Sequence, residues 1–244
     1  MNHKKLNIII GWMVFAIATV VYFMTLEETT SLWDCGEYIT TAYKLEVGHP
    51  PGAPLFMMLG RIFSMFTSPE NAAYMINAMS GLSSSFTILF LFWTITLFGK
   101  KIALKDGGEI TSGRSIAIIG SGAVGALAYT FTDSFWFSAV EGEVYAMASL
   151  FTAIVFWAIL KWDDEIRHKQ AMLLETGKSS LRWIILIMFV LGLAIGVHLL
   201  GLLAIPAIAY VIYFNHSKNV NLGGIILTGV IGVVTLGFIQ EGII

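Results

Sequence analysis

The sequence predicts an all-α membrane protein folded as a polytopic helical bundle. Of its 244 residues, 57% are hydrophobic and only 12% are charged, about half the charged share of a soluble domain. Apolar segments of roughly the length that crosses a bilayer, about 20 residues, recur along the chain. The net charge is −2, and no basic stripe is interleaved with aromatic residues, so a nucleic-acid partner is not expected.

About seven transmembrane helices are expected, in a single domain. The first follows a short basic start, and bulky residues continue to its end, which indicates an uncleaved anchor rather than a signal peptide. The expected spans lie near residues 6–25, 72–98, 115–132, 143–160, 183–197, 199–214 and 222–239.

Lysines and arginines predict which side each loop occupies. All but Lys44 and Arg61 of the 14 fall into four groups, at residues 4–5, 100–114, 161–182 and 218. The positive-inside rule places these groups, and with them the N-terminus, in the cytoplasm. Most of the acidic residues are then expected outside, and the 161–182 loop is expected to be a solvated charged linker.

The apolar stretch 183–214 leaves two alternatives. As one helix it would be about 48 Å long, too long for an upright span. Because basic groups flank it on what must be one side of the membrane, an even number of crossings is required. We therefore favour two short spans turning near 196–198, with one tilted helix as the alternative.

The external loop 26–71 contains a shorter apolar stretch, residues 53–66, interrupted by Gly60 and Arg61. We expect it to form an amphipathic helix in the membrane interface. Cys35 is the only cysteine, so no disulfide can form within the chain.

Two motifs in this loop are candidates for chemistry. A helix beginning near Asp34 would place Asp34 and Glu37 on one face, suited to acid–base catalysis or cation binding. The alternative is a capping box in which Ser31 and Asp34 are structural. Downstream, three prolines within 50–54 predict a rigid turn that presents His49 at a fixed angle; the alternative is a stiff lead into the interfacial helix, with His49 merely solvated.

Two further candidates are expected on the same side. Glu141, Glu143 and Tyr145 open the fourth span, where they either line a polar cavity or simply complement the helix dipole. His198 lies in an apolar stretch, where a lone histidine is more often a satisfied interhelical donor than a catalyst. The four candidates converge on one surface.

A resemblance to a known family is carried by residues 34–37 (Asp-Cys-Gly-Glu) and 49–55 (His-Pro-Pro-Gly-Ala-Pro-Leu). With 141–145 and 196–202, they resemble motifs of a bacterial multi-spanning family whose animal relatives are protein O-mannosyltransferases. Cys35 departs from the small Ser or Thr that is usual there. Family members continue into further spans, so we expect this chain to be the N-terminal part of a longer protein.

The resemblance implies a glycosyltransferase of the GT-C type in a bacterial inner membrane, with its active face periplasmic. Such an enzyme moves a sugar, which the animal relatives indicate is mannose, from a polyprenyl-phosphate donor to a hydroxyl acceptor, a protein Ser/Thr or a glycan. No cofactor is expected; two carboxylates alone are a weak ligand set for a divalent cation. The rival functions are a transporter or flippase for a lipid-linked sugar and a non-catalytic membrane scaffold.

The resemblance also implies roles for the candidate residues. Asp34 corresponds to the general base, with Glu37 as its orienter or a second acid. His49 is expected to contact phosphate or sugar, and Glu141, Glu143 and Tyr145 to bind sugar or acceptor. His198 and Arg61 are expected to face the lipid phosphate, with snorkelling to headgroups as the alternative for Arg61.

Overall fold

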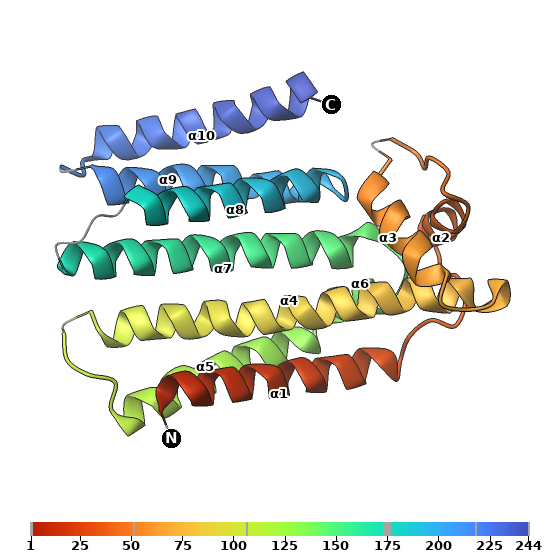
Figure 1. Cartoon of the computed structure of the whole chain (residues 1–244), viewed down its shortest axis with the longest axis horizontal. Helices are drawn as coiled ribbons and strands as arrows, with labels where there is room; N and C mark the ends of the chain where they lie inside the picture. The colour runs from red at the N-terminus through yellow and green to blue at the C-terminus, as the bar shows by residue number, and fades with distance from the viewer. Residues whose placement is uncertain (1, 51, 106, 173–176, 218, 244) are drawn as a thin grey trace.

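The computed structural model describes residues 2–50, 52–105, 107–172, 177–217 and 219–243, and within them all regular structure is helical (Figure 1). The helices are α1 (His3–Phe23), α2 (Cys35–Lys44), α3 (Pro54–Ser64), η1 (Pro69–Asn71), α4 (Ala72–Ala103), α5 (Ser112–Thr130), α6 (Asp133–Val140), α7 (Val144–Ala171), α8 (Gly177–Ile195), η2 (Leu199–Ala204), α9 (Ile205–His216) and α10 (Leu222–Ile243). This confirms the predicted fold class.

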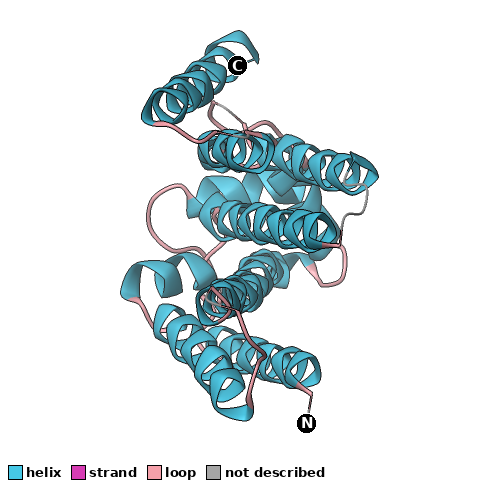
Figure 2. Ribbon diagram, turned by 90° about the vertical axis from the view of Figure 1, so that its left-hand side faces the viewer, coloured by secondary structure: helices cyan, strands magenta, loops and turns pink. Residues whose placement is uncertain are grey.

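The long helices stack from α1 at one side of the molecule to α10 at the other, with α5 beside α1 and α4 (Figures 1 and 2). Helix α4 lies at the centre of the first half, in contact with α1, α5 and α7. Small side chains allow these close approaches: α4 buries Ser83, Ser84 and Ser85, and a Cβ at Gly122 of α5 would lie 2.5 Å from Thr96 Cγ2.

Five helical segments of the described chain are long and apolar enough to cross a membrane. They are His3–Phe23, Pro69–Ala103, Val144–Lys169, Leu199–His216 and Leu222–Gly242. Helices α5 and α6, bent by 67°, make a sixth if they count as one span. About seven spans were expected. The seventh corresponds to the apolar part of α8, Leu181–Ile195, which is shorter than the other candidate spans. The chain is an integral membrane protein.

The 183–214 stretch is not one helix. Helix α8 ends at Ile195, and His198 has an extended backbone (φ −163°) before η2 begins. Pro206 then stands in the first turn of α9, where proline is tolerated. The chain reverses at this break, so α9 runs back alongside α8 (Figure 1).

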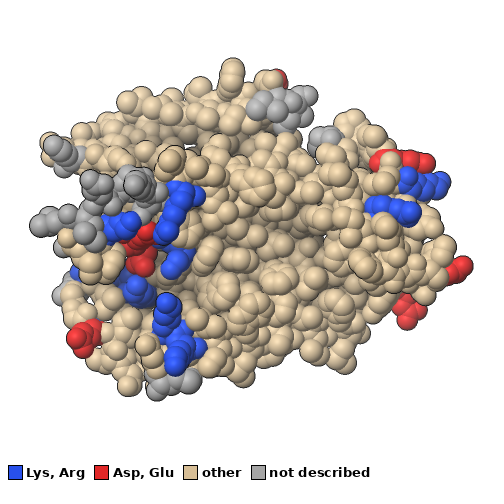
Figure 3. All heavy atoms as spheres, in the orientation of Figure 1, with Lys and Arg blue, Asp and Glu red and all other residues tan. Residues whose placement is uncertain are grey.

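Charged groups gather at the two ends of the bundle. The start of α1 and the α4–α5, α7–α8 and α9–α10 connections lie at one end, while α2, α3 and the α6–α7 junction lie at the other (Figure 1). Figure 3 shows a cluster of lysine and arginine side chains at the first end and a tan, uncharged waist between the ends. This is the separation that the distribution of basic residues predicts.

The expectation of a solvated linker over 161–182 is wrong. Helix α7 continues to Ala171, and within its charged portion Trp162 and Ile166 are 0% and 2% exposed. These two residues are four apart and so share one helix face, which packs into a core cluster with α8 and α9. Residues 173–176 lie outside the described part of the chain.

The same portion of α7 carries an ionic network around the buried carboxylate of Asp163. The Asp163 carboxylate accepts hydrogen bonds from Lys101 of α4, from Arg167 Nε (3.0 Å) and from Asn215 Nδ2 of α9 (3.0 Å). One carboxylate thus joins three helices where they leave the apolar region. Its side chain is only 9% exposed, whereas those of Lys101 and Arg167 are 26% and 64% exposed, so water partly solvates the donors that its removal leaves.

We therefore predict that Asp163→Ala destabilises the protein by about 1 kcal/mol, because its partners are partly solvated. The measurement is the thermal unfolding midpoint in detergent, with Glu109→Ala as a control that removes an exposed carboxylate near the same end. Equal midpoints for the two variants would show that the network contributes nothing to stability.

Candidate functional site

Asp34 and Glu37 lie at the N-terminal end of α2. Asp34 is the N-cap residue, and its side chain makes no capping hydrogen bond; its backbone carbonyl accepts the N–H of Tyr38 (2.9 Å). The capping-box alternative is therefore wrong, because the Ser31 hydroxyl donates instead to the Glu141 carboxylate. The Asp34 carboxylate remains exposed at the surface of this end of the bundle.

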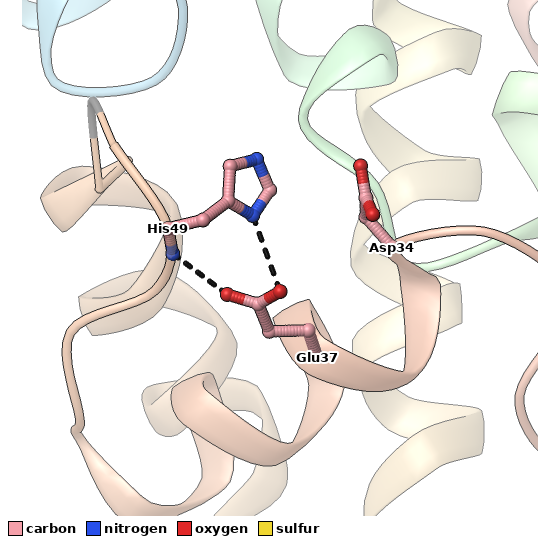
Figure 4. Close-up of side chains that lie close together, drawn as sticks. All are labelled: Asp34, Glu37 and His49. Carbon is pink, nitrogen blue, oxygen red and sulfur yellow. Dashed lines mark hydrogen bonds and ion pairs between the residues drawn. The ribbon is translucent and has the colours of Figure 1, made fainter.

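Glu37 is bound to His49 through both of its carboxylate oxygens (Figure 4). The His49 backbone N–H donates to Oε1 at 2.6 Å, and ring Nδ1 lies 3.2 Å from Oε2. These two contacts, the backbone one first, lower the pKa of Glu37 below its ordinary value. The carboxylate thus stays ionised and holds the histidine in place.

The turn after His49 is fixed by its backbone. The Gly52 N–H donates to the His49 carbonyl at 2.8 Å, and Gly52 has φ +91°, a conformation that glycine adopts without strain. The His49 ring packs against that of Tyr38, with centroids 5.6 Å apart. A single turn therefore does both things that the prolines predicted: it holds His49 at a fixed angle and it leads the chain into α3.

Asp34, Glu37 and His49 are the described residues best placed to hold a cation. One ligand atom from each lies within 4.8 Å of the others, and all three side chains are exposed. Figure 4 shows the Asp34 carboxylate beside the Glu37–His49 pair without a bond to it. Each Glu37 oxygen makes one contact with His49 and keeps a further lone pair, so the three groups form a weak candidate set of ligands for a cation.

The Glu141 and Glu143 carboxylates lie behind this surface, in the junction between α6 and α7. They are 4% and 6% exposed. Burial raises the pKa of both; for Glu143 the neighbouring charges of Glu141 and then Asp34 add to burial and bring it to about 7. A carboxyl group with this pKa exchanges its proton near neutral pH.

Gly142 allows the junction to lie against α2 and α4. A Cβ at this position would lie 2.9 Å from Asn77 Oδ1 and 2.9 Å from Ile39 Cγ1. The two glutamates on either side are therefore held in place by close packing of the backbone between them.

Tyr145 and His198 meet at the start of α7. Their ring centroids are 5.5 Å apart, and His198 Nδ1 accepts the Leu200 N–H at 3.1 Å. Burial lowers the pKa of His198, so its neutral form is favoured, with the proton on Nε2. The histidine can then donate one hydrogen bond to a ligand.

Arg61 has a structural contact. Its Nη1 donates to the Tyr43 carbonyl at 2.8 Å, close to the C-terminal end of α2, and its guanidinium lies over the Tyr43 ring, 5.1 Å from the centroid. Arg61 thus ties α3 to α2.

Asn77 of α4 belongs to none of the sequence motifs that predicted the site. It is fully buried in α4, and its Nδ2 donates to the Glu27 and Thr29 carbonyls at 2.8 and 2.9 Å. These bonds attach the segment that precedes Asp34 to the bundle. The signal was present in the sequence, as an amide within an apolar span.

Electrostatics links the candidates. The charge of His49 opposes the rise in the Glu143 pKa, and that of Asp34 adds to it. Burial first, and then Asp34, Glu143, Tyr145 and Glu37, raise the pKa of Tyr38 to about 12. Groups from α2, the His49 turn and the start of α7 are therefore close enough to influence each other at one end of the bundle.

We predict that Glu143 makes stability depend on pH. Because its pKa rises from 4.5 to about 7 on folding, the folded protein binds this proton more tightly, and stability falls as the pH rises from about 4.5 to 7. Glu143→Gln should flatten this decline in the thermal midpoint, whereas Glu28→Gln, which removes an exposed carboxylate of the external loop, should not. An unchanged slope in Glu143→Gln would contradict the assignment.

Two known proteins to which this chain is similar are both protein O-mannosyl-transferases. The chain is 31% identical over 157 residues to the protein O-mannosyl-transferase tmem260 of Dictyostelium discoideum, covering 63% of this chain and 17% of that protein. It is 27% identical over 157 residues to the mouse protein O-mannosyl-transferase TMEM260, covering 64% of this chain and 20% of that protein. The chain spans about a fifth of the length of these curated relatives. No solved structure matches it.

A family model described as the N-terminal domain of protein O-mannosyl-transferase TMEM260 matches residues 34–221. The match begins at Asp34 and includes the Glu37–His49 pair, the α6–α7 junction and His198. Since it covers well over half of the chain, the chain belongs to the family of the TMEM260 N-terminal domain.

Proposed function

We propose that this chain carries the catalytic membrane domain of a protein O-mannosyltransferase. It would transfer mannose from a polyprenyl-phosphate donor to a serine or threonine hydroxyl, in the manner of GT-C glycosyltransferases. The proposal draws on the names of the relatives, which describe much longer proteins, and on the chemistry of the site.

One observation carries the proposal: carboxylates from two distant parts of the chain meet at one end of the bundle. Asp34 is exposed and Glu143 is buried, and the charge of the first raises the pKa of the second. An exposed carboxylate is suited to take the proton of a hydroxyl acceptor, and a buried carboxyl group near it is suited to hydrogen-bond the hydroxyls of the donor sugar. Their position at the ends of the spans suits a donor whose tail stays in lipid.

In the proposed reaction the acceptor oxygen attacks the anomeric carbon of the donor sugar. The carbon–oxygen bond to phosphate breaks, and polyprenyl phosphate leaves with the electron pair. The hydroxyl proton passes to the Asp34 carboxylate. Glu37 and His49, joined to each other, fix the α2 end and the following turn around the acceptor.

The remaining groups would bind the donor. Neutral His198 can donate its Nε2 proton to a phosphate oxygen, next to Tyr145. Glu143, and Glu141 behind it, can bond sugar hydroxyls. Arg61 donates one of its five N–H groups to Tyr43, and its remaining donors would face the lipid phosphate.

The positive-inside rule supports an orientation for this site. With the lysine-rich end in the cytoplasm, Asp34 and its neighbours face the opposite side. In a bacterial inner membrane that side is the periplasm, where the lipid-linked sugar and the acceptor would meet.

We predict that Asp34→Asn lowers sugar transfer by at least about 100-fold, because the amide cannot accept the acceptor proton. The measurement is transfer from labelled polyprenyl-phosphate mannose to a Ser/Thr peptide by membranes that contain the protein. Glu28→Gln is the matched control, as it removes an exposed carboxylate of the same loop.

Near wild-type transfer by Asp34→Asn, at normal expression, would remove Asp34 from the mechanism. In liposomes, release of polyprenyl phosphate together with a glycosylated peptide supports a transferase. Movement of intact donor across the bilayer without peptide modification would instead support a transporter.

A further inference from the structure

A cavity lined by charged and polar side chains lies at the opposite end of the bundle from Asp34. Its volume is about 680 Å³, and it opens between α1, α4 and α7. Among the residues that line it are Lys4 and Asn7 of α1, Lys100 of α4, and Lys161 and Asp164 of α7. The cavity belongs to the lysine-rich end seen in Figure 3.

The cavity carries an excess of positive charge. Three helices each supply one ammonium group, whereas one carboxylate, Asp164, lines the cavity. That carboxylate is bound to Lys100, with Nζ 3.3 Å from Oδ2. Neither Lys4 nor Lys161 has a carboxylate partner among the described residues, so two cations are available to a ligand.

Other groups around the cavity can complement an anion that carries hydroxyls. Helix α1 begins here, and the N-terminus of a helix favours negative charge. Asn7 Oδ1 is buried and has no hydrogen-bond partner in the described part of the chain, so it can accept a hydrogen bond from a ligand hydroxyl. Such a set of groups suits a phosphodiester bearing a polyol.

The surroundings favour a lipid as the source of that group. The cavity lies at the ends of three apolar helices, and the neighbouring α1 residues Ile8 and Ile9 are 44% and 47% exposed. Leu97 of α4 also lines it. A lipid bound with its headgroup among the lysines would have its acyl chains beside these apolar side chains.

We propose that this cavity binds the phosphodiester headgroup of an anionic membrane lipid. The bound headgroup would join α1 and α7 through Lys4 and Lys161, beside the Lys100–Asp164 pair that links α4 to α7. Because the cavity lies at the far end of the bundle, this role is independent of the proposed sugar transfer.

The test is lipid binding to the delipidated membrane protein by native mass spectrometry, with phosphatidylglycerol compared against phosphatidylcholine. Wild type should prefer phosphatidylglycerol, and Lys4→Gln/Lys161→Gln should lose at least about tenfold in affinity for it. Lys5→Gln/Lys105→Gln removes two exposed lysines of the same end that do not line the cavity, and should bind as wild type does.

A charge-preserving variant, Lys4→Arg/Lys161→Arg, should keep the preference for phosphatidylglycerol. It shows whether the Gln variant loses binding through its missing charge or through misfolding. If the two Gln double variants lost affinity for phosphatidylglycerol equally, the lipid would be held by the general positive charge of this end and not by the cavity. Displacement of phosphatidylglycerol by millimolar inorganic phosphate would overturn the lipid assignment in favour of a soluble phosphate.

Discussion

A hydrocarbon layer accepts no unpaired charge, and this constraint arranges the whole chain. The spans connect two ends, with lysine-rich connections at one and the Asp34 and Glu143 carboxylates at the other (Figures 1 and 3). Residues more than a hundred positions apart are therefore neighbours because each lies at the same end of a span. The candidate site therefore depends first on which end of each span its residues occupy, and only then on local sequence motifs.

Local bonds then hold the site-bearing segment on the bundle. Asn77 binds the Glu27 and Thr29 carbonyls from within α4. At the other side of the loop, the Leu55 N–H at the start of α3 donates to the Gly196 carbonyl at 2.7 Å. The His49 turn is thus connected to the chain reversal that carries His198. These are buried or partly buried polar contacts, which fix one geometry because leaving them unmade is costly.

Most of the fold follows from apolar segment length and the placement of lysines, which is why the helical spans and the charge separation could be predicted. The ionic portion of α7 could not, because composition hid the Trp162–Ile166 face that packs against α8 and α9. The motifs identified Asp34, Glu37, His49 and Glu143, but not their partners. That Ser31 binds Glu141 rather than capping α2, and that Arg61 binds Tyr43, depends on tertiary contacts that no local pattern encodes.

The central claim is that Asp34, His49 and Glu143 share one electrostatic environment. It is tested most directly by measuring the Glu143 pKa, for example by NMR of labelled glutamate, in wild type and in two variants. We expect Asp34→Asn to lower this pKa, because a neighbouring negative charge is lost, and His49→Gln to raise it, because a neighbouring positive charge is lost. A Glu143 pKa that neither substitution changes would contradict it.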